Sequence, residues 1–160
     1  MIYGAILDKG EPWYTDMSRI FAAMEGRQND YNWLVTAYEC YPSYPETQRL
    51  FDREYLWLSG KKLTEITAGE PLQWVWGVFS GFPRHIPLTE VLKYPLPHTD
   101  GYECFLYGPL SIQNPLAEIA IVPMDSTLTL LFSRTPEWAE QFRKAFPLSR
   151  ALPLHQPQSF

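Results

Sequence analysis

Fifteen prolines are distributed along this chain of 160 residues, about twice the number that average usage would give. Each proline fixes the backbone φ angle and removes an amide donor, so long helices and uninterrupted central strands are both disfavoured. The chain must therefore consist of short elements joined by rigid turns. We expect an α+β fold: a mainly antiparallel twisted β-sheet with two or three short helices packed on it.

The size and composition of the chain predict a single globular domain. Hydrophobic residues make up 46% of the sequence and charged residues 19%, which excludes disorder as the global state. We expect one α+β domain over residues 1–148. Residues 149–160 contain two prolines and no hydrophobic periodicity, so we expect them to form a mobile C-terminal tail.

The chain has the features of a cytoplasmic protein. No apolar run approaches the roughly 20 residues that a membrane-spanning helix needs. The N-terminal segment MIYGAILD has neither the basic region of a secretory signal nor the composition of a mitochondrial presequence. Cys40 and Cys104 are far apart and belong to no CxxC or Cys/His cluster, as is usual in reduced proteins. We expect a cytoplasmic location and no membrane partner.

Hydrophobic periodicity divides the chain into short elements. The segments with a strand pattern are 2–7, 31–41, 54–58, 61–66, 73–79, 102–107, 117–122 and 127–133. Three helices are expected, from residue 17 after a cap at Thr15 or Asp16, over residues 87–93, and from residue 136 after a cap at Thr135. The Ser59-Gly60 pair separates two of the strands and predicts a hairpin turn. Residues 42–47 are expected to form a loop, and residues 124–126 are expected to form a tight turn between the last two strands.

The acidic residues of the chain are unevenly distributed. The net charge is −5, and residues 94–133 contain no lysine or arginine but four acids, which are Asp100, Glu103, Glu118 and Asp125. One interpretation is a solvated surface that maintains solubility. The other is an acidic face that attracts a basic protein partner. Nucleic acid is disfavoured, because phosphate binding requires clustered cations and the longest basic run is Lys61-Lys62.

Three blocks of sequence carry a resemblance. They are NWLVTAYE, GVFSGFP and IQNPLAEIAIVPMDSTLTLLFSR, which occur in this order between the first helix and the last. In these blocks the chain resembles an uncharacterised family of small, single-domain bacterial proteins. The resemblance covers most of residues 2–148 and implies a bacterial cytosolic origin and an α+β fold. It implies no reaction, ligand or catalytic residue.

The histidines and cysteines have no spacing typical of a metal site. His85, His98 and His155 are not paired, and the nearest cluster is His98, Asp100, Glu103 and Cys104. Cys104 and His98 would form a nucleophile and base if the loop folded back on the next strand. Alternatively, the cysteine is packed as a small hydrophobic residue, which the acidic surroundings favour. We expect no cofactor and no metal.

Carboxylates offer a second route to catalysis. Glu39 lies on the same side of its predicted strand as Trp33 and Val35, so burial there would raise the pKa of its carboxyl group. A pair with Glu103, Glu118 or Asp125 would then suit general acid and base roles. The alternative is that these groups lie at turns, at strand ends and on polar faces, where water reaches them.

Aromatic and charged residues outside the regular patterns are the candidate contact residues. The strand pattern at 73–79 is apolar on both faces and predicts a central strand. The segment after it contains Phe82, Arg84 and His85, although it could equally be a strand terminator that completes the core. Trp13 precedes a helix and Trp57 lies near the predicted hairpin tip, whereas Trp33, Trp74, Trp76 and Trp138 occupy patterned faces and are expected in the core.

These features favour a non-enzymatic bacterial protein-binding module. An immunity protein or antitoxin that masks a basic nuclease would be small, acidic and free of catalytic motifs, and no GxGxxG, GxxxxGK[ST] or GxSxG sequence is present. The expected binding residues are Trp13, Trp57, Phe82, Arg84, His85, Asp100, Glu103 and Asp125. The alternatives are a small-molecule binding protein or small hydrolase with an aromatic-lined pocket containing His85, His98 or Glu39, and a homo-oligomer that uses a sheet edge.

Overall fold

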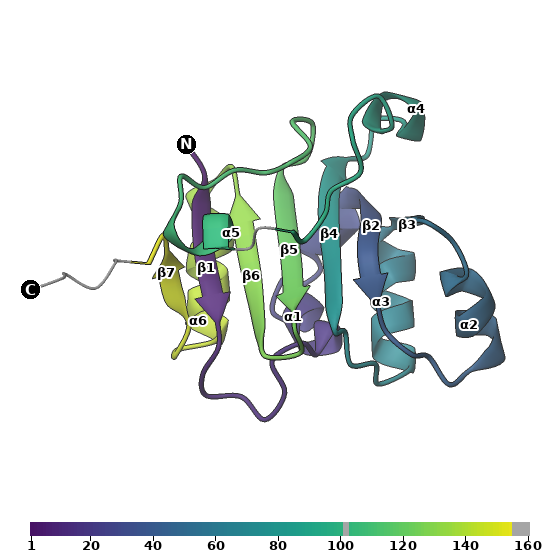
Figure 1. Ribbon diagram of the computed structural model, residues 1–160, viewed down its shortest axis with the longest axis horizontal. Coiled ribbons are helices and arrows are strands. Elements are labelled where there is room, and N and C mark those ends of the chain that lie inside the picture. The colour runs from purple at the N-terminus through teal and green to yellow at the C-terminus, as the bar shows by residue number, and fades with distance from the viewer. Residues whose placement is uncertain (101–102, 155–160) are drawn as a thin grey trace, which may run out of the picture.

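The computed structural model describes residues 1–100 and 103–154, and the side chains of Glu103 and Cys104 are outside that description. Its centre is an open antiparallel sheet of seven strands in the order β3-β2-β4-β5-β6-β1-β7 (Figure 1). The strands are β1 (Tyr3–Leu7), β2 (Tyr31–Glu39), β3 (Leu56–Ser59), β4 (Trp76–Pro83), β5 (Ile119–Met124), β6 (Leu128–Ser133) and β7 (Arg150–Leu152). The expected α+β class with an antiparallel sheet is confirmed.

Helices cover one face of this sheet and a long connection covers the other. The helices are α1 (Met17–Ala22), the 3-10 turn η1 (Arg27–Asp30), α2 (Pro45–Phe51), α3 (Gly60–Gly69), α4 (Leu88–Val91), α5 (Glu103–Tyr107) and α6 (Pro136–Ala145). Figure 1 shows α1, α3 and α6 behind the sheet, α5 in front of it, and α2 beside the β3 edge. No helix within the described residues is long and apolar enough to span a membrane.

Each face of the sheet buries its own apolar cluster. On the helical face, Trp74 and Phe79 meet edge to face with ring centroids 4.8 Å apart, and Phe21 from α1 meets Trp33 at 5.4 Å. The opposite face buries Leu34, Val78, Phe82, Val91 and Phe132. Because both faces are covered, β4 is apolar on both sides, as the pattern of residues 73–79 predicted.

The hairpin expected at Ser59-Gly60 is not formed, and this prediction was wrong. β3 ends at Ser59, whose hydroxyl caps α3 by accepting from the Lys62 amide at 3.1 Å. Gly60 is the first residue of α3 and packs against the backbone of η1. The local turn signal was therefore a helix start, and the expected strand at 61–66 is helical.

Two further expectations about secondary structure were wrong. The segment 102–107 was expected as a strand, but its described residues 103–107 pair with no strand of the sheet. Residues 103–107 instead form α5, which lies over the sheet with Phe105 against Phe132. The loop expected over 42–47 includes the first turn of α2, where Pro45 occupies a position that proline tolerates.

The segment expected to be a mobile tail begins with a strand. Arg150–Leu152 pairs with β1, and the Arg150 guanidinium lies 2.7 Å from the Asp8 carboxylate. The apolar Leu152 is buried against the sheet, which a pattern of only three residues could not reveal. Residues 155–160, including His155, lie outside the described part of the chain.

Candidate functional site

A β-bulge in β2 changes the face on which Glu39 lies. Thr36 pairs with Val78 and Glu39 pairs with Trp76, so three residue steps on β2 oppose two on β4. Ala37 takes up the extra residue with a left-handed φ of 49°. Glu39 consequently shares a face with Trp76 instead of Trp33, and it is exposed. The expectation that Glu39 faces the buried side of its strand was wrong, because strict alternation fails at a bulge.

Three chain segments meet at the sheet end that this bulge creates. The Val75 amide donates to the Glu39 carbonyl at 2.9 Å, and the Ser126 amide donates to the Val75 carbonyl at 3.1 Å. Trp76 also pairs with Met124, the residue before Asp125. The half-buried indole of Trp76 therefore lies between an exposed Glu39 on one strand and an exposed Asp125 after the other. We call Glu39, Tyr41, Trp76 and Asp125 the acidic sheet end.

The turn that carries Asp125 holds a defined conformation. Asp125 and Ser126 both adopt left-handed φ angles, 53° and 56°, as in tight hairpin connections. The turn at 124–126 expected from the sequence is confirmed. Beside it lies a small hollow of about 60 Å³, lined by Trp76, Met124, Asp125, Thr127 and Leu128. Asp125 and Trp76 thus border the same depression.

Tyr41 forms a hydrogen bond with Glu39, the other carboxylate of this site. Its hydroxyl donates to Glu39 Oε1, and the ring is 73% exposed. The hydrogen bond to Glu39, and secondarily the charge of Glu39, raises the pKa of the Tyr41 phenol. Tyr41 therefore remains a neutral donor at physiological pH and orients Glu39.

The acids of this sheet end have no basic partner among the described residues. The ion pairs among the described residues are Arg19–Glu11, Lys93–Glu90 and Arg150–Asp8. Neither Glu39 nor Asp125 belongs to one of them. The negative charge of both groups is therefore available to a molecule outside the chain.

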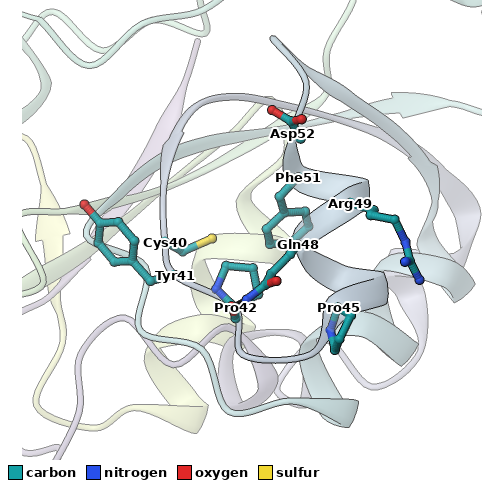
Figure 2. A pocket seen from close by; sticks show the side chains of 8 residues that line it. All are labelled: Cys40, Tyr41, Pro42, Pro45, Gln48, Arg49, Phe51 and Asp52. Carbon is teal, nitrogen blue, oxygen red and sulfur yellow. Dashed lines mark hydrogen bonds between the residues drawn. The ribbon is translucent and has the colours of Figure 1, made fainter.

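A wide hollow of about 710 Å³ follows directly along the chain, between residues 40–45 and α2. In Figure 2 the sulfur of Cys40 points into it toward Phe51, whereas the ring of Tyr41 and the guanidinium of Arg49 point away. Its wall also includes Pro42, Gln48 and Asp52. The helix α2 buries none of its residues, so this hollow is an open one formed by a projecting element.

A buried carboxylate anchors the loop beside this hollow. Glu70 is only 4% exposed, and its Oε1 accepts from the amides of Ser43 and Tyr44, the latter at 3.1 Å. Its Oε2 is buried without a hydrogen-bond partner among the described residues. Burial, and secondarily the charge of Glu70, raises the pKa of the Cys40 thiol to about 12. Cys40 is therefore a protonated thiol at neutral pH and a poor nucleophile.

The residues expected after the central strand do not form one site. Phe82 is fully buried, with its ring 5.7 Å from that of the half-buried Trp57, so both contribute to packing. Arg84 and His85 are exposed in the turn that follows β4. Trp13 is half-buried, with its indole nitrogen enclosed and unpartnered among the described residues.

The acids of residues 94–133 are likewise separated by the fold. Glu118 and Asp125 lie just beyond opposite ends of β5, and Glu118 accepts from the Tyr31 hydroxyl at 3.0 Å. Asp100 is exposed in the segment that crosses the sheet, where the Thr36 hydroxyl binds the Pro97 carbonyl. Glu103 starts α5, and its side chain is outside the described part.

The predicted catalytic groupings find little support in the geometry. His98 is exposed, and its backbone pairs with the side chain of Gln113 at 2.9 and 2.7 Å. The side chain of Cys104 lies outside the described residues, so the proposed thiol and imidazole pair is not placed. His85, His98 and Glu39 are all exposed, and none lines the hollow of Figure 2. Within the described residues, no three metal-binding side chains converge.

Sequence reasoning identified Asp125 and considered its pairing with Glu39, but it missed Trp76 and Tyr41 as members of the site. Trp76 was assigned to the core because both faces of its segment are apolar, yet it lies where the sheet ends and is half-buried. The acidic Glu39 on an otherwise apolar side of its predicted strand was a signal for the site, but it did not point to Trp76. Comparison with known proteins supplied no relative, since no family model, curated protein or solved structure matches the chain.

Proposed function

We propose that the chain is a non-enzymatic bacterial protein-binding module of the immunity or antitoxin kind, acting in the cytoplasm on a basic protein. The observation that carries the proposal is the acidic sheet end, where Glu39 and Asp125 flank a half-buried Trp76. Both acids are free of ion pairs within the described residues. The surface therefore combines negative charge with aromatic area.

This combination suits recognition of a protein. Tyrosine and tryptophan are enriched in binding hot spots because they supply large, rigid contact area and a polar handle. Uncompensated carboxylates accelerate encounter with a basic partner and orient it. The net charge of −5 adds a field of the same sign.

The expected salt dependence and the two acids define the test. The protein is immobilised and exposed to a bacterial lysate at low salt and at about 0.5 M salt, where the Debye length falls to a few ångströms. We expect a basic protein to be retained at low salt and released at high salt. The double variant Glu39→Gln/Asp125→Asn should lose it.

A matched control separates this site from overall charge. Glu137→Gln/Glu140→Gln removes two exposed acids from α6, with the same change in net charge. This variant should retain the partner. Equal loss in both double variants would show that net charge alone is responsible, and retention by both would reject the acidic sheet end as the interface.

The hollow of Figure 2 supports a second candidate, a small-molecule binding protein. Its volume of about 710 Å³ lies within the range of roughly 300–1,000 Å³ of ligand pockets. Cys40 and Phe51 contribute apolar area to its lining, and Gln48 adds an amide group. A ligand that raises the melting temperature of the wild type, but not of Gln48→Ala, would support this function. If no ligand class shifts the melting temperature, protein binding remains the one function proposed for the chain.

A further inference from the structure

We infer that the acidic sheet end is a binding site for a single arginine side chain of the partner protein, which stacks on Trp76 between Glu39 and Asp125. The inference rests on the proposed function and specifies the chemistry of the contact. The three residues lie on or next to adjacent strands, β2, β4 and β5.

The spacing of the strands suits one planar cation. Neighbouring strands are about 4.8 Å apart, so the backbones of Glu39 and of Met124, the residue before Asp125, are about 10 Å apart across Trp76. Glu39 is paired with Trp76 on one side, and Asp125 lines the same small hollow as Trp76 on the other. A guanidinium over the indole can therefore donate to both carboxylates, with its flat face on the ring.

The same stacking occurs elsewhere in this chain. The Arg27 guanidinium lies over the Trp138 ring with its central carbon 4.0 Å from the ring centroid. It also donates to Gln141 at 3.3 Å, so it combines stacking with a hydrogen bond. Trp76 is half-buried and is flanked by two acidic residues, whereas Trp138 already has a cation of this chain on its ring.

The acidic residues of this binding site are ordered in the unbound protein. The Tyr41 hydroxyl binds Glu39, and the left-handed residues 125 and 126 define the position of Asp125. The hollow of about 60 Å³ beside Trp76 is lined by Met124 and Leu128, which can contact the methylene groups of an arginine. Lysine fits less well, because its ammonium group is a compact charge. It cannot stack face to face on an indole ring or donate two parallel hydrogen bonds to a carboxylate.

The inference is tested with two peptides that differ in charge alone. Acetyl-Gly-Arg-Gly-amide is titrated to millimolar concentration into the ¹⁵N-labelled protein, and the indole signal of Trp76, assigned with Trp76→Phe, is followed. The citrulline peptide, which is neutral and nearly isosteric, is the control. We expect the arginine peptide to shift the Trp76 indole signal, and the citrulline peptide to leave it unchanged.

The variants separate this contact from a general attraction. Glu39→Gln/Asp125→Asn should weaken arginine peptide binding by about fivefold or more, and Glu137→Gln/Glu140→Gln should leave it unchanged. Equal shifts with both peptides, or no shift with either, would overturn the inference. If the retained basic protein still depends on Glu39 and Asp125 in that case, the proposed function stands. If neither acid affects its retention, the proposed function fails as well.

Discussion

The α-carbon of Gly60 packs directly against the carbonyl group of Gln28, so closely that a Cβ at position 60 would overlap the carbonyl oxygen. The same Cβ would lie 2.8 Å from the α-carbon of Asn29. Both obstacles are backbone atoms, which cannot rotate away as a side chain can. The contact joins α3 to η1 and limits position 60 to glycine.

Gly60→Ala should therefore destabilise the protein by more than about 2 kcal/mol, because the added methyl group must displace backbone. Urea denaturation followed by circular dichroism measures the free energy of unfolding. Gly69→Ala, at the other end of α3, is the control, since a Cβ there meets nothing within 4 Å. It should be neutral or stabilising by up to about 1 kcal/mol. Equal effects of both variants would contradict the packing argument.

Phe79 occupies the centre of the helical-face core, where it meets Trp74 at 4.8 Å and Phe21 at 5.9 Å. We expect Phe79→Ala to reduce the free energy of unfolding by about 3–5 kcal/mol, because it removes a fully buried ring and leaves a cavity. Thermal and urea unfolding give this value. Tyr44→Ala removes a ring that is 51% exposed and should change stability by less than about 1 kcal/mol.

Asp16 caps α1, and its carboxylate accepts from the Ser18 amide at 3.1 Å and from the Ser18 hydroxyl at 2.7 Å. Asp16→Ala should cost about 1 kcal/mol, since the first-turn amide loses its acceptor. The midpoint of urea unfolding should fall while its slope remains unchanged. Glu65→Ala, on the exposed side of α3, removes the same charge without a cap and should have almost no effect.

The Cys40 thiol makes stability depend on alkaline pH. Its pKa is raised from 9.0 to about 12 in the folded protein, first by burial and then by Glu70. The unfolded chain therefore loses this proton at a lower pH than the folded chain does. The associated stability is complete below about pH 9 and is lost as the pH rises toward 12.

Cys40→Ala isolates this contribution from the other groups that titrate at alkaline pH. Urea unfolding of both proteins is measured from neutral pH to about pH 11. We expect the wild type to lose more stability over the alkaline part of this range than Cys40→Ala loses. Parallel pH profiles would show that the thiol titrates alike in the folded and unfolded chains.

The elements that sequence patterns predicted well are those whose determinants are neighbours in the chain. Asp16 reaches an amide two residues away, and the turn at Asp125 joins adjacent strands, so both were predicted. Gly60 depends on Gln28, more than thirty residues earlier. A helix start and a hairpin turn have similar local signals at Ser59-Gly60, and only that distant contact decides between them.

The candidate site was predictable only in part for the same reason. The carboxylates of Asp125 and Glu39 were both identified, but they come from separate strands that the sequence does not align with each other or with Trp76. A single extra residue at Ala37 also reversed the side on which Glu39 lies. A bulge of this kind follows from the register between strands, and strict alternation along one strand conceals it.

The position of β1 has a consequence for synthesis. This strand, near the start of the chain, lies between β6 and β7, whose residues follow it by more than a hundred positions. While the ribosome makes the intervening chain, Tyr3–Leu7 has none of its sheet partners and exposes apolar residues to the cell. The nascent protein completes its sheet only when the last third has emerged, so the growing chain depends on protection from aggregation until then.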